Sequence, residues 1–504
     1  MKKFASLLIS FIVLFSEAQA ANLLAVYDQA QRSDPIFQQA VAQRLATQTG
    51  VPISVAALLP NILFTAQPSV SRIGYSGSNF VPVVGDSAAF LNPRNITERT
   101  YEMNLSVTQT VFNFAQFSSV AQQVSLSKGA DATLNAAIQN LMVRVASAYF
   151  AVLQDEDNLS YADASKAAYA EQLDQIQQQY KVGLKTLTDV YTAQASYDSA
   201  VATYIQSQTN LTNDRENLRV ITGVYYPHLS ALSDDFPLIT PQPANIDTWV
   251  RTSLAQNWTI KASQYNTDSA REVINQQLAG HLPNANVQVN LNKQTTDNIN
   301  DYISFIDRPG PGTTSDRSIA LNFNFPIFSG GSVVAQTNQA KYNYQVAQQQ
   351  LEQTARSTVN TARQSYLGIV AGISKIHADK ETIKSSISSL EGLEASYRVG
   401  TETLVDVLNQ QQKVFQAQTQ YATDRYAFVN NILALKQAAG TLSYNDLRAI
   451  NAWLIEERRS YKVMRHEYRR QIHHVVKHSR AAKHHKQIHK SCVKKKLQHK
   501  KHHG

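Results

Sequence analysis

The feature that most constrains the fold is an internal repeat. Residues 180–190 read YKVGLKTLTDV, and residues 397–407, 217 positions later, read YRVGTETLVDV. The same offset aligns further identical pairs: Tyr149 with Tyr366, Gln194 with Gln411, Leu218 with Leu435 and Gly223 with Gly440. Repetition at a fixed offset indicates two copies of one structural unit. The sequence therefore predicts two similar halves, residues 21–223 and 246–455, joined by a linker over 224–245.

The two ends of the chain are predicted to lie outside this repeat. Residues 1–20 combine a basic start, an apolar run and an Ala-Gln-Ala cleavage site, which is typical of a secretory signal peptide. A short N-terminal anchor is the alternative, but about twelve apolar residues are too few to span a bilayer. Residues 456–504 hold sixteen Lys and Arg, three Glu and ten His. This tail could bind transition metals loosely, attract anionic polymers, or form a solvated extension without fixed structure.

The overall charge and the cysteine content narrow the class of protein. The net charge of +9 belongs to the tail, because residues 21–455 carry a net charge of −5. Cys492 is the only cysteine, so a disulfide framework is excluded and no cysteine near position 21 could carry a lipid anchor. No uninterrupted apolar run reaches eighteen residues, so we expect no transmembrane helix.

Long helices are predicted wherever proline is absent. The chain contains no proline from Arg94 to Tyr226 and none after Pro326. Segments 114–223 and 330–440 are rich in Ala, Gln, Leu, Glu and Lys, which favour helix. A helix of about sixty residues spans roughly 90 Å. The amide-rich pattern favours coiled-coil-like packing in which a second face of each helix contacts water. An ordinary helical bundle fits the pattern too.

Four shorter segments alternate between apolar and polar residues: 62–71, 101–112, 286–292 and 318–325. Period-two alternation predicts strands, and runs of about ten residues with one apolar face are typical of membrane-barrel strands. A half-buried strand of a soluble protein has the same local pattern. The strands come in two pairs, each joined by a long polar segment, 74–99 or 293–317. The predicted fold class is therefore α+β.

Four strands cannot close a barrel. An open sheet edge in lipid would leave backbone groups without hydrogen bonds. If the strands span a membrane, other copies of the chain must complete the barrel, and an oligomer becomes a physical requirement. Three copies would give twelve strands, although the residues by themselves do not fix that number.

An ordered set of motifs resembles the TolC-type outer-membrane efflux factors over residues 21–455. The motifs are Val111-Phe112, Ile221-Thr222-Gly223 with Pro227, Phe325-Pro326-Ile327-Phe328-Ser329-Gly330-Gly331, and Tyr397 followed by Gly400-Thr401 and Val405-Asp406-Val407-Leu408. The resemblance implies a homotrimer with a twelve-stranded barrel in outer-membrane lipid, continued by a long α-helical barrel in the periplasm. It implies docking to an inner-membrane pump through a periplasmic adaptor. It also implies export of drugs, amphiphiles or secreted proteins, without a cofactor or nucleic acid.

The resemblance further implies a gate at the periplasmic end. The family's gate links match three positions here: Thr188, Asp189 and Tyr397. Position 402, usually arginine in the family, is Glu402 in this chain, which removes an expected link to Asp189. The closed state is then expected to be weaker, or to be held by another cation such as Arg398 or Lys185.

Two further groups of site residues follow from the resemblance. The family's pore constriction has two aspartates one helical turn apart, whereas this chain has Asp406 and Asn409. A trimer would arrange them as a ring of carboxylates beside a ring of amides, which favours cations; alternatively, Asp406 only caps a helix. Gly183 and Gly400 would form the tips where an adaptor docks, and both also fit helix C-terminal glycines.

Enzymatic chemistry is not indicated. His228, His281 and His377 are scattered without metal-ligand spacing, and no Ser–His–Asp set is visible. Gly330-Gly331 is better explained by a strand-to-helix turn than by phosphate binding. Besides the transport duct, two alternatives stay open: a structural or adhesive outer-membrane oligomer, and a periplasmic coiled-coil adaptor without membrane strands.

Overall fold

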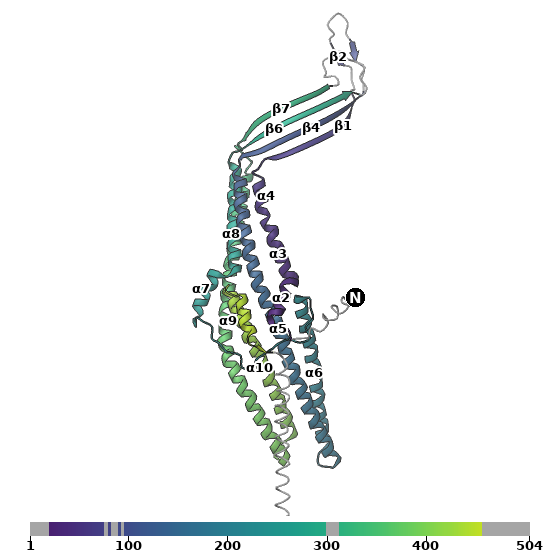
Figure 1. The fold of residues 1–504 in the computed structure, drawn as a ribbon, viewed down its shortest axis with the longest axis vertical. Coiled ribbons are helices and arrows are strands. Elements are labelled where there is room, and N and C mark those ends of the chain that lie inside the picture. The colour runs from purple at the N-terminus through teal and green to yellow at the C-terminus, as the bar shows by residue number, and fades with distance from the viewer. Residues whose placement is uncertain (1–19, 75–78, 82–88, 92–94, 299–311, 456–504) are drawn as a thin grey trace, which may run out of the picture. The chain divides into compact units, whose positions relative to one another are not determined.

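The structure, a computed structural model, describes residues 20–74, 79–81, 89–91, 95–298 and 312–455. The basic tail and all of the signal peptide except Ala20 lie outside these residues. The helices are α2 (Leu23–Ser33), α3 (Pro35–Gln48), α4 (Gly50–Ala56), α5 (Phe114–Lys181), α6 (Leu187–Thr222), α7 (Ile246–Gln256), α8 (Trp258–Leu278), η1 (Ala279–His281), α9 (Ser332–Val399), α10 (Leu404–Ala438) and α11 (Tyr444–Asn451). The strands are β1 (Asn61–Gly74), β2 (Asn79–Val81), β3 (Ala89–Leu91), β4 (Asn95–Phe112), β5 (Ala231–Leu232), β6 (Asn284–Asn298), β7 (Gly312–Asn324) and β8 (Leu454–Ile455) (Figure 1).

The chain divides into two compact units, which cut across the predicted repeats. The hairpin unit contains residues 1–38, 137–255 and 359–504. The strand unit contains residues 39–136 and 256–358. The division into two repeats stays a prediction. Helices α5 and α9 run from one unit into the other, and each contains 68 residues.

Four antiparallel strands of the strand unit form one sheet in the order β1–β4–β6–β7. The register aligns apolar residues across the sheet: Phe64 with Leu105, Leu105 with Leu291, and Val289 with Ile319. Polar residues align on the other face, where Asn322 donates a hydrogen bond to Asn286 at 3.0 Å. Because side chains alternate between the faces of a strand, the sheet has one apolar and one polar face. The four predicted strands are confirmed.

The apolar face is not covered by other described parts of the chain. Ile319 is 79% exposed, Phe323 69% and Phe64 62%. Exposed aliphatic and aromatic side chains in such a continuous band mark a surface that another apolar phase covers. This arrangement matches the lipid-facing side of a membrane sheet.

The strands are longer than the alternation predicts, and the loops 74–99 and 293–317 are correspondingly shorter. β4 begins at Asn95, β6 continues to Asn298, and β7 begins at Gly312. In the added parts both faces are mostly polar, as at Arg99 opposite Asp297 and Thr100 opposite Thr296. The apolar–polar signal is therefore lost there while backbone pairing continues.

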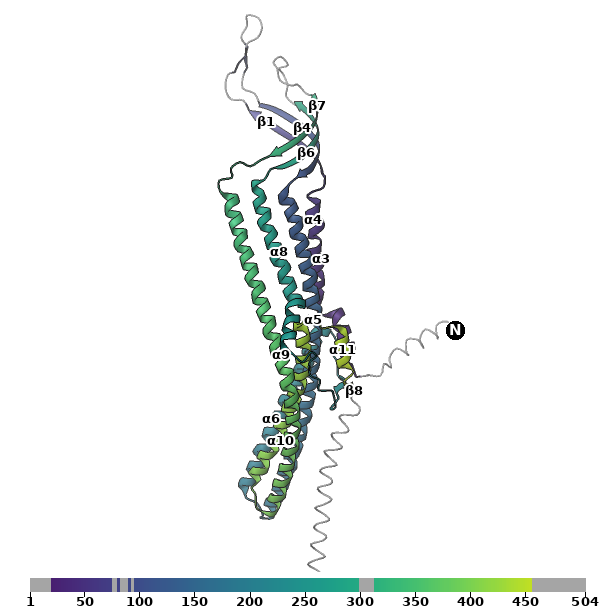
Figure 2. The ribbon, with the colours of Figure 1, turned by 90° about the vertical axis from the view of Figure 1, so that its left-hand side faces the viewer.

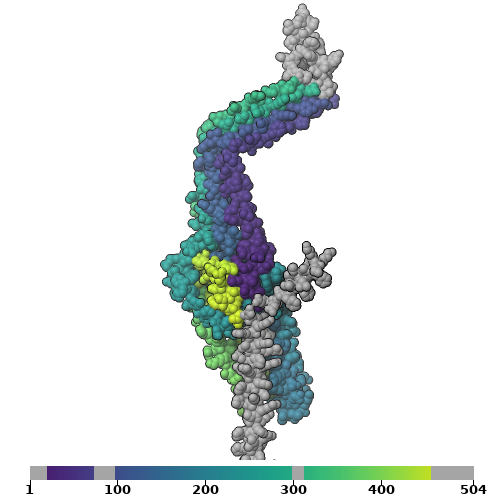
Figure 3. All heavy atoms as spheres, in the orientation of Figure 1, coloured from purple at the N-terminus to yellow at the C-terminus, as the bar shows by residue number. Residues whose placement is uncertain are grey.

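β1 and β7 form the two edges of this sheet. In the space-filling view, β1 (purple) and β7 (green) lie along opposite margins of the strand layer (Figure 3). Neither edge has a further partner strand among the described residues. An unpaired edge exposes a row of N–H and C=O groups, which is unfavourable in lipid.

The helices of the hairpin unit form two antiparallel pairs. The pair α5–α6 is hairpin one and the pair α9–α10 is hairpin two. Both turns lie at the same end of the helices (Figures 1 and 2). The predicted proline-free helices are confirmed, since a helix of 68 residues, about 100 Å long, needs an uninterrupted sequence of helix formers.

One described helix, α5, includes a stretch long and apolar enough to cross a membrane by composition alone. Half of that stretch is buried inside the protein, as in the core helix of a soluble protein. The apolar side chains that are buried include Tyr149, Phe150 and Leu153, all at most 2% exposed. Packing within the protein therefore accounts for the composition of this helix.

The predicted linker, residues 224–245, is packed against the helices within the hairpin unit. Its strand β5 pairs with β8, and Leu232 and Phe236 are buried. Arg425 of α10 is only 2% exposed. Its guanidinium donates hydrogen bonds to the carbonyls of Leu232 at 2.6 Å and Ser233 at 3.2 Å. It also forms ion pairs with the carboxylates of Asp234 at 3.2 Å and Asp157 at 3.8 Å. Burial raises the pKa of Asp157, against the opposing effect of Arg425. The cluster fixes this segment to α5 and α10.

Candidate functional site

The candidate site lies at the turns of the two hairpins, in the hairpin unit. Gly183 and Gly400 have φ angles of +75° and +83°, which L side chains rarely adopt. Around Gly183, the N–H groups of Gly183 and Leu184 donate to the carbonyls of Tyr180 and Gln179. The turn at Gly400 repeats this pattern. Both are Schellman-type helix ends, so the helix-end interpretation of the glycines is confirmed, while adaptor docking stays a prediction.

Each turn leads into a capped helix. Thr186 accepts a hydrogen bond from the N–H of Asp189 at 3.2 Å, and Oδ2 of Asp189 accepts the N–H of Thr186 at 3.0 Å. Thr403 and Asp406 form the same reciprocal pair, at 3.3 and 3.2 Å. Such capping boxes satisfy backbone donors that the first helical turn leaves free. They explain why a Thr-x-x-Asp pattern follows both glycines.

The caps also set the ionisation of both aspartates. The pKa of Asp189 is lowered, chiefly by the backbone N–H of Thr186. The pKa of Asp406 is lowered, chiefly by the hydroxyl of Thr403. Both carboxylates therefore stay charged well into the acidic range. Within one chain, Asp406 acts as a helix cap, and its pore role stays a prediction.

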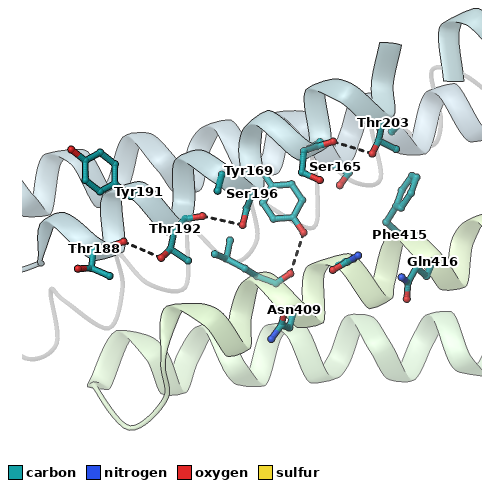
Figure 4. Close-up of a pocket in the computed structure, with 16 residues that line it drawn as sticks. Ser165, Tyr169, Thr188, Tyr191, Thr192, Ser196, Thr203, Asn409, Phe415 and Gln416 are labelled. Carbon is teal, nitrogen blue, oxygen red and sulfur yellow. Dashed lines mark hydrogen bonds between the residues drawn. The ribbon is translucent and has the colours of Figure 1, made fainter. Parts of the chain in front are cut away.

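Asn409 lies one turn after Asp406 on α10. Its side chain is exposed and lines a groove of about 620 Å³ between α5, α6 and α10 (Figure 4). Thr188 lines the same groove from α6. The structure thus brings together Asn409 and Thr188, which sequence reasoning assigned to two different features, a constriction and a gate.

A stripe of hydroxyl side chains forms the α6 wall of this groove, and sequence reasoning missed it. Its members are Thr188, Thr192, Ser196, Ser199 and Thr203, spaced three or four residues apart. Three of these hydroxyls donate to the carbonyl one turn earlier, as Thr192 does to Thr188 at 2.9 Å (Figure 4). The helical spacing in the sequence was the signal that could have revealed it.

Beside the groove, a group of apolar residues joins the two hairpins. This seam cluster consists of Tyr169, Leu173, Ile176, Ala193, Ala200, Leu404 and Leu408, with Val190, Tyr197 and Tyr397 packed against it. The hydroxyl of Tyr169 donates to the carbonyl of Leu408 at 3.1 Å. The cluster draws on α5 and α6 of hairpin one and on α9 and α10 of hairpin two, so it holds the hairpins of one chain together.

Among the described residues, no hydrogen bond or ion pair joins Tyr397 or Glu402 to the other predicted gate residues. The hydroxyl of Tyr397 is buried and has no hydrogen-bond partner. Glu402 is exposed. Of the two candidate substitute cations, Arg398 pairs with Glu394 at 3.4 Å. Lys185 places its ammonium 4.2 Å from the centre of the Tyr397 ring.

A family model described as outer membrane efflux protein matches residues 26–224 and 249–441 of the chain. The chain belongs to the outer membrane efflux protein family. The resemblance noted from the motifs is confirmed. The protein is located in the outer membrane with a periplasmic extension, and it is a channel for efflux or secretion. A family of channels is consistent with a function that is not enzymatic.

Individual relatives agree with the family. The chain is 36% identical to outer membrane protein TolC of Escherichia coli (strain K12) over 460 residues, which cover 90% of this chain and 89% of that protein. It is 33% identical to TolC of Vibrio cholerae, covering 90% of this chain and 99% of that protein. It is 26% identical to the alkaline protease secretion protein AprF of Pseudomonas aeruginosa, covering 88% and 89%.

Solved structures share the fold. The outer membrane protein VceC from Vibrio cholerae has a TM-score of 0.66 at 18% identity, covering 83% of this chain and 96% of that chain. The CmeC outer membrane channel of Campylobacter jejuni has a TM-score of 0.67 at 17% identity, covering 86% and 90%. The α+β fold class of this efflux family member is therefore confirmed.

Proposed function

We propose that this protein is the outer-membrane channel-tunnel of a tripartite efflux or type I secretion system. It would export drugs, amphiphiles or proteins across the periplasm and outer membrane. The observation that carries the proposal is the sheet of β1, β4, β6 and β7, which has an exposed apolar face, a polar face and two unpaired edges. Such a sheet is complete only when other copies pair with its edges.

Closure of the sheet supports a homotrimer. Three copies would supply twelve strands, within the range of outer-membrane barrels. The apolar face would contact outer-membrane lipid, and the polar face would line an aqueous lumen. The long hairpins would extend the duct into the periplasm. The two hairpins of each chain would give the helical barrel six hairpins.

Three assignments at the hairpin ends belong to this proposal. Asp406 and Asn409 would form rings at the constriction. The gate links would involve a set of four residues: Thr188, Asp189, Tyr397 and Glu402. Gly183 and Gly400 would present the tips to a periplasmic adaptor, which would connect the channel to an inner-membrane pump. The exposed aliphatic side chains of Val182 and Val399, 70% and 75% exposed, support such a contact.

A deletion strain tests the proposal. Loss of the protein is expected to make cells sensitive to dyes and detergents or to stop secretion of a protein into the medium, and plasmid-borne protein should restore the phenotype. A structural or adhesive oligomer, the second candidate, predicts normal resistance and normal secretion. That result would contradict the channel.

The adaptor contact has its own test. Photo-crosslinkers at Gly183 and Gly400 should capture a periplasmic adaptor together with its inner-membrane partner. A crosslinker at Val220, which is 75% exposed near the opposite end of α6, is the matched control. Equal capture from all three positions would contradict docking at the tips.

A further inference from the structure

The charged residues of the four-stranded sheet are sorted between its two faces. All the bases of β1, β4, β6 and β7 lie on the apolar face, because they alternate in step with Phe64 and Leu105. Three acids, Glu98, Glu102 and Asp316, lie on the polar face. The bases, which we call the basic rim, are Arg72, Arg99, Lys293 and Arg317. The two faces therefore differ in the sign of their charge as well as in polarity.

Each member of the basic rim ends an apolar run on its strand, and each is exposed. On β7, Arg317 follows Ile319 on the apolar face, and on β6, Lys293 follows Leu291. The other two members follow an apolar or aromatic residue on β1 and β4 in the same way. In every strand the base lies toward the end that is farther along the chain from the adjoining helix (Figure 1).

The opposite, helix-side ends of the strands carry no such rim. Their segments, which contain no charged residue on either face, are 61–64, 105–112, 284–291 and 319–324. A sheet that spans a membrane therefore has bases at only one of its two lipid boundaries. In the proposed channel the helices extend into the periplasm, so the rim lies at the boundary with the cell exterior.

Lys293 and Arg317 form one pair within the rim. Lys293 lies opposite Ser315, and Arg317 is the next residue of β7 on the same face. Diagonal neighbours of this kind are about 7–8 Å apart across a sheet. Neither base has a carboxylate partner among the residues that the structure describes, and Asp316 points to the other face. Two cations at this spacing repel each other unless an anion lies between them.

Arg72 and Arg99 form a second pair of the same geometry. Arg72 lies opposite Thr97, and Arg99 is the next residue of β4 on that face. Arg99 also lies opposite Asp297 of β6. Because this acid offsets one of the two charges, the second pair attracts an anion less strongly than the pair of Lys293 and Arg317.

The chemistry of the first pair matches a lipid phosphate. Lys and Arg bind phosphate oxygens through charge-assisted hydrogen bonds, and their long stems let the charged ends reach the headgroup level of a bilayer. Leu291 and Ile319 precede the two bases on the same face and are exposed. A lipid would place its phosphate between the bases and its acyl chains on these side chains. A free anion in solution would gain only the charges.

We propose that Lys293 and Arg317 bind the phosphate of an anionic lipid in the outer leaflet, with Arg72 and Arg99 as a weaker second site. The inference rests on the proposed function, because the apolar face meets lipid only when the sheet closes into a membrane barrel. The lipid would then hold this end of the sheet at a fixed depth in the membrane.

Titration of the full-length, detergent-solubilised protein with lipid A tests the site, with bound lipid counted by native mass spectrometry. Lipid A carries two phosphates, and it should bind the unmodified protein more tightly than monophosphoryl lipid A does. Lys293→Gln with Arg317→Gln should weaken binding about fivefold for each cation removed, or roughly 25-fold in all. Lys293→Arg with Arg317→Lys keeps both charges and should preserve binding. Arg72→Gln with Arg99→Gln should have a smaller effect.

Two controls separate a site from a general effect of charge. Arg271→Gln with Lys341→Gln removes the same two residue types from exposed positions of α8 and α9 and should leave binding unchanged. Asp316→Asn, next to Arg317 but on the polar face, should also change nothing, whereas it would tighten binding if only net charge mattered. Gel mobility of the unheated oligomer checks that each variant assembles.

The possible outcomes are distinct. Equal binding of lipid A by the unmodified protein and by Lys293→Gln with Arg317→Gln would overturn the inference, and so would an equal loss in the helix control. Displacement of lipid A by millimolar inorganic phosphate would assign the pair to a free anion and overturn the lipid site. An unmodified protein that forms no channel in planar bilayers would instead overturn the proposed function.

Discussion

Arg144 of α5 donates two hydrogen bonds to the carboxylate of Asp34, at 2.5 and 3.3 Å. Asp34 lies between α2 and α3 and is only 2% exposed. Its Oδ2 also accepts the N–H of Phe37 at 2.9 Å, so the same carboxylate caps the start of α3. One buried group therefore connects the N-terminal helices to the long helix of hairpin one.

Removal of this carboxylate should destabilise the protein strongly. Asp34→Ala leaves the guanidinium of Arg144 without its partner, at an expected cost of about 3–5 kcal/mol in the free energy of unfolding. Chemical denaturation in detergent measures it. Glu216→Ala, which breaks an exposed pair with Arg219, is the control and should cost about 0–1 kcal/mol. Similar effects of the two variants would contradict the structural role of Asp34.

The cluster around Arg425 should control the order of residues 224–245. Arg425→Met removes the donors to Leu232 and Ser233 and leaves Asp157 buried without a cation, so we expect a loss of about 3–5 kcal/mol. Limited proteolysis should cut this segment faster. The double variant Arg425→Met with Asp157→Asn should recover part of the loss, since the only carboxylate of the cluster left without its cation, that of Asp234, is exposed to solvent. No recovery would show that packing, and not charge, holds the segment.

Cap and pore roles of Asp406 can be separated. In the proposed trimer, Asp406→Ala removes both the carboxylate ring and the cap, and it should weaken block by polyvalent cations several-fold in single-channel recordings. Thr403→Ala removes the cap alone and should leave the block unchanged. Asn409→Asp adds a second ring and should strengthen it. Unchanged block in Asp406→Ala would refute the constriction.

Acid should loosen both hairpin turns. The folded-state pKa values of Asp189 and Asp406 are lowered by their caps. Their contribution to stability is therefore fully present above the unfolded pKa of about 3.9. This contribution is lost as the pH falls through the lowered pKa values of the two aspartates in the folded state. Amide hydrogen exchange at the starts of α6 and α10 should accelerate in this window. Thr186→Ala and Thr403→Ala should reduce the pH dependence, and an unchanged dependence would argue against the caps.

Much of the fold could be predicted because its elements are long and regular. The four strands were visible where Phe64, Leu105 or Ile319 alternates with polar neighbours. The strand ends were not, because beyond the apolar band both faces are polar and only backbone pairing continues. The packing of residues 224–245 was also missed, since Arg425 reaches this segment from about 190 residues away.

The site could be predicted only in part. The Tyr-x-Val-Gly pattern predicted two turns with helix ends. The sequence offered Lys185 and Arg398 as equal candidates for a substitute cation. Only the structure separates them, because the contact of Lys185 depends on where the end of α9 lies beside the other hairpin.

The sequence by itself determined the long helices, the four strands, and the equivalence of Lys185 with Glu402. These properties follow from local periodicity, from the absence of proline and from a constant offset, all of which act along the chain. The tertiary structure decided which cation contacts Tyr397, which hydroxyls share a groove with Asn409, and how Arg425 holds a distant segment. Such contacts join residues that are far apart in the chain, and no local pattern specifies the distance between them.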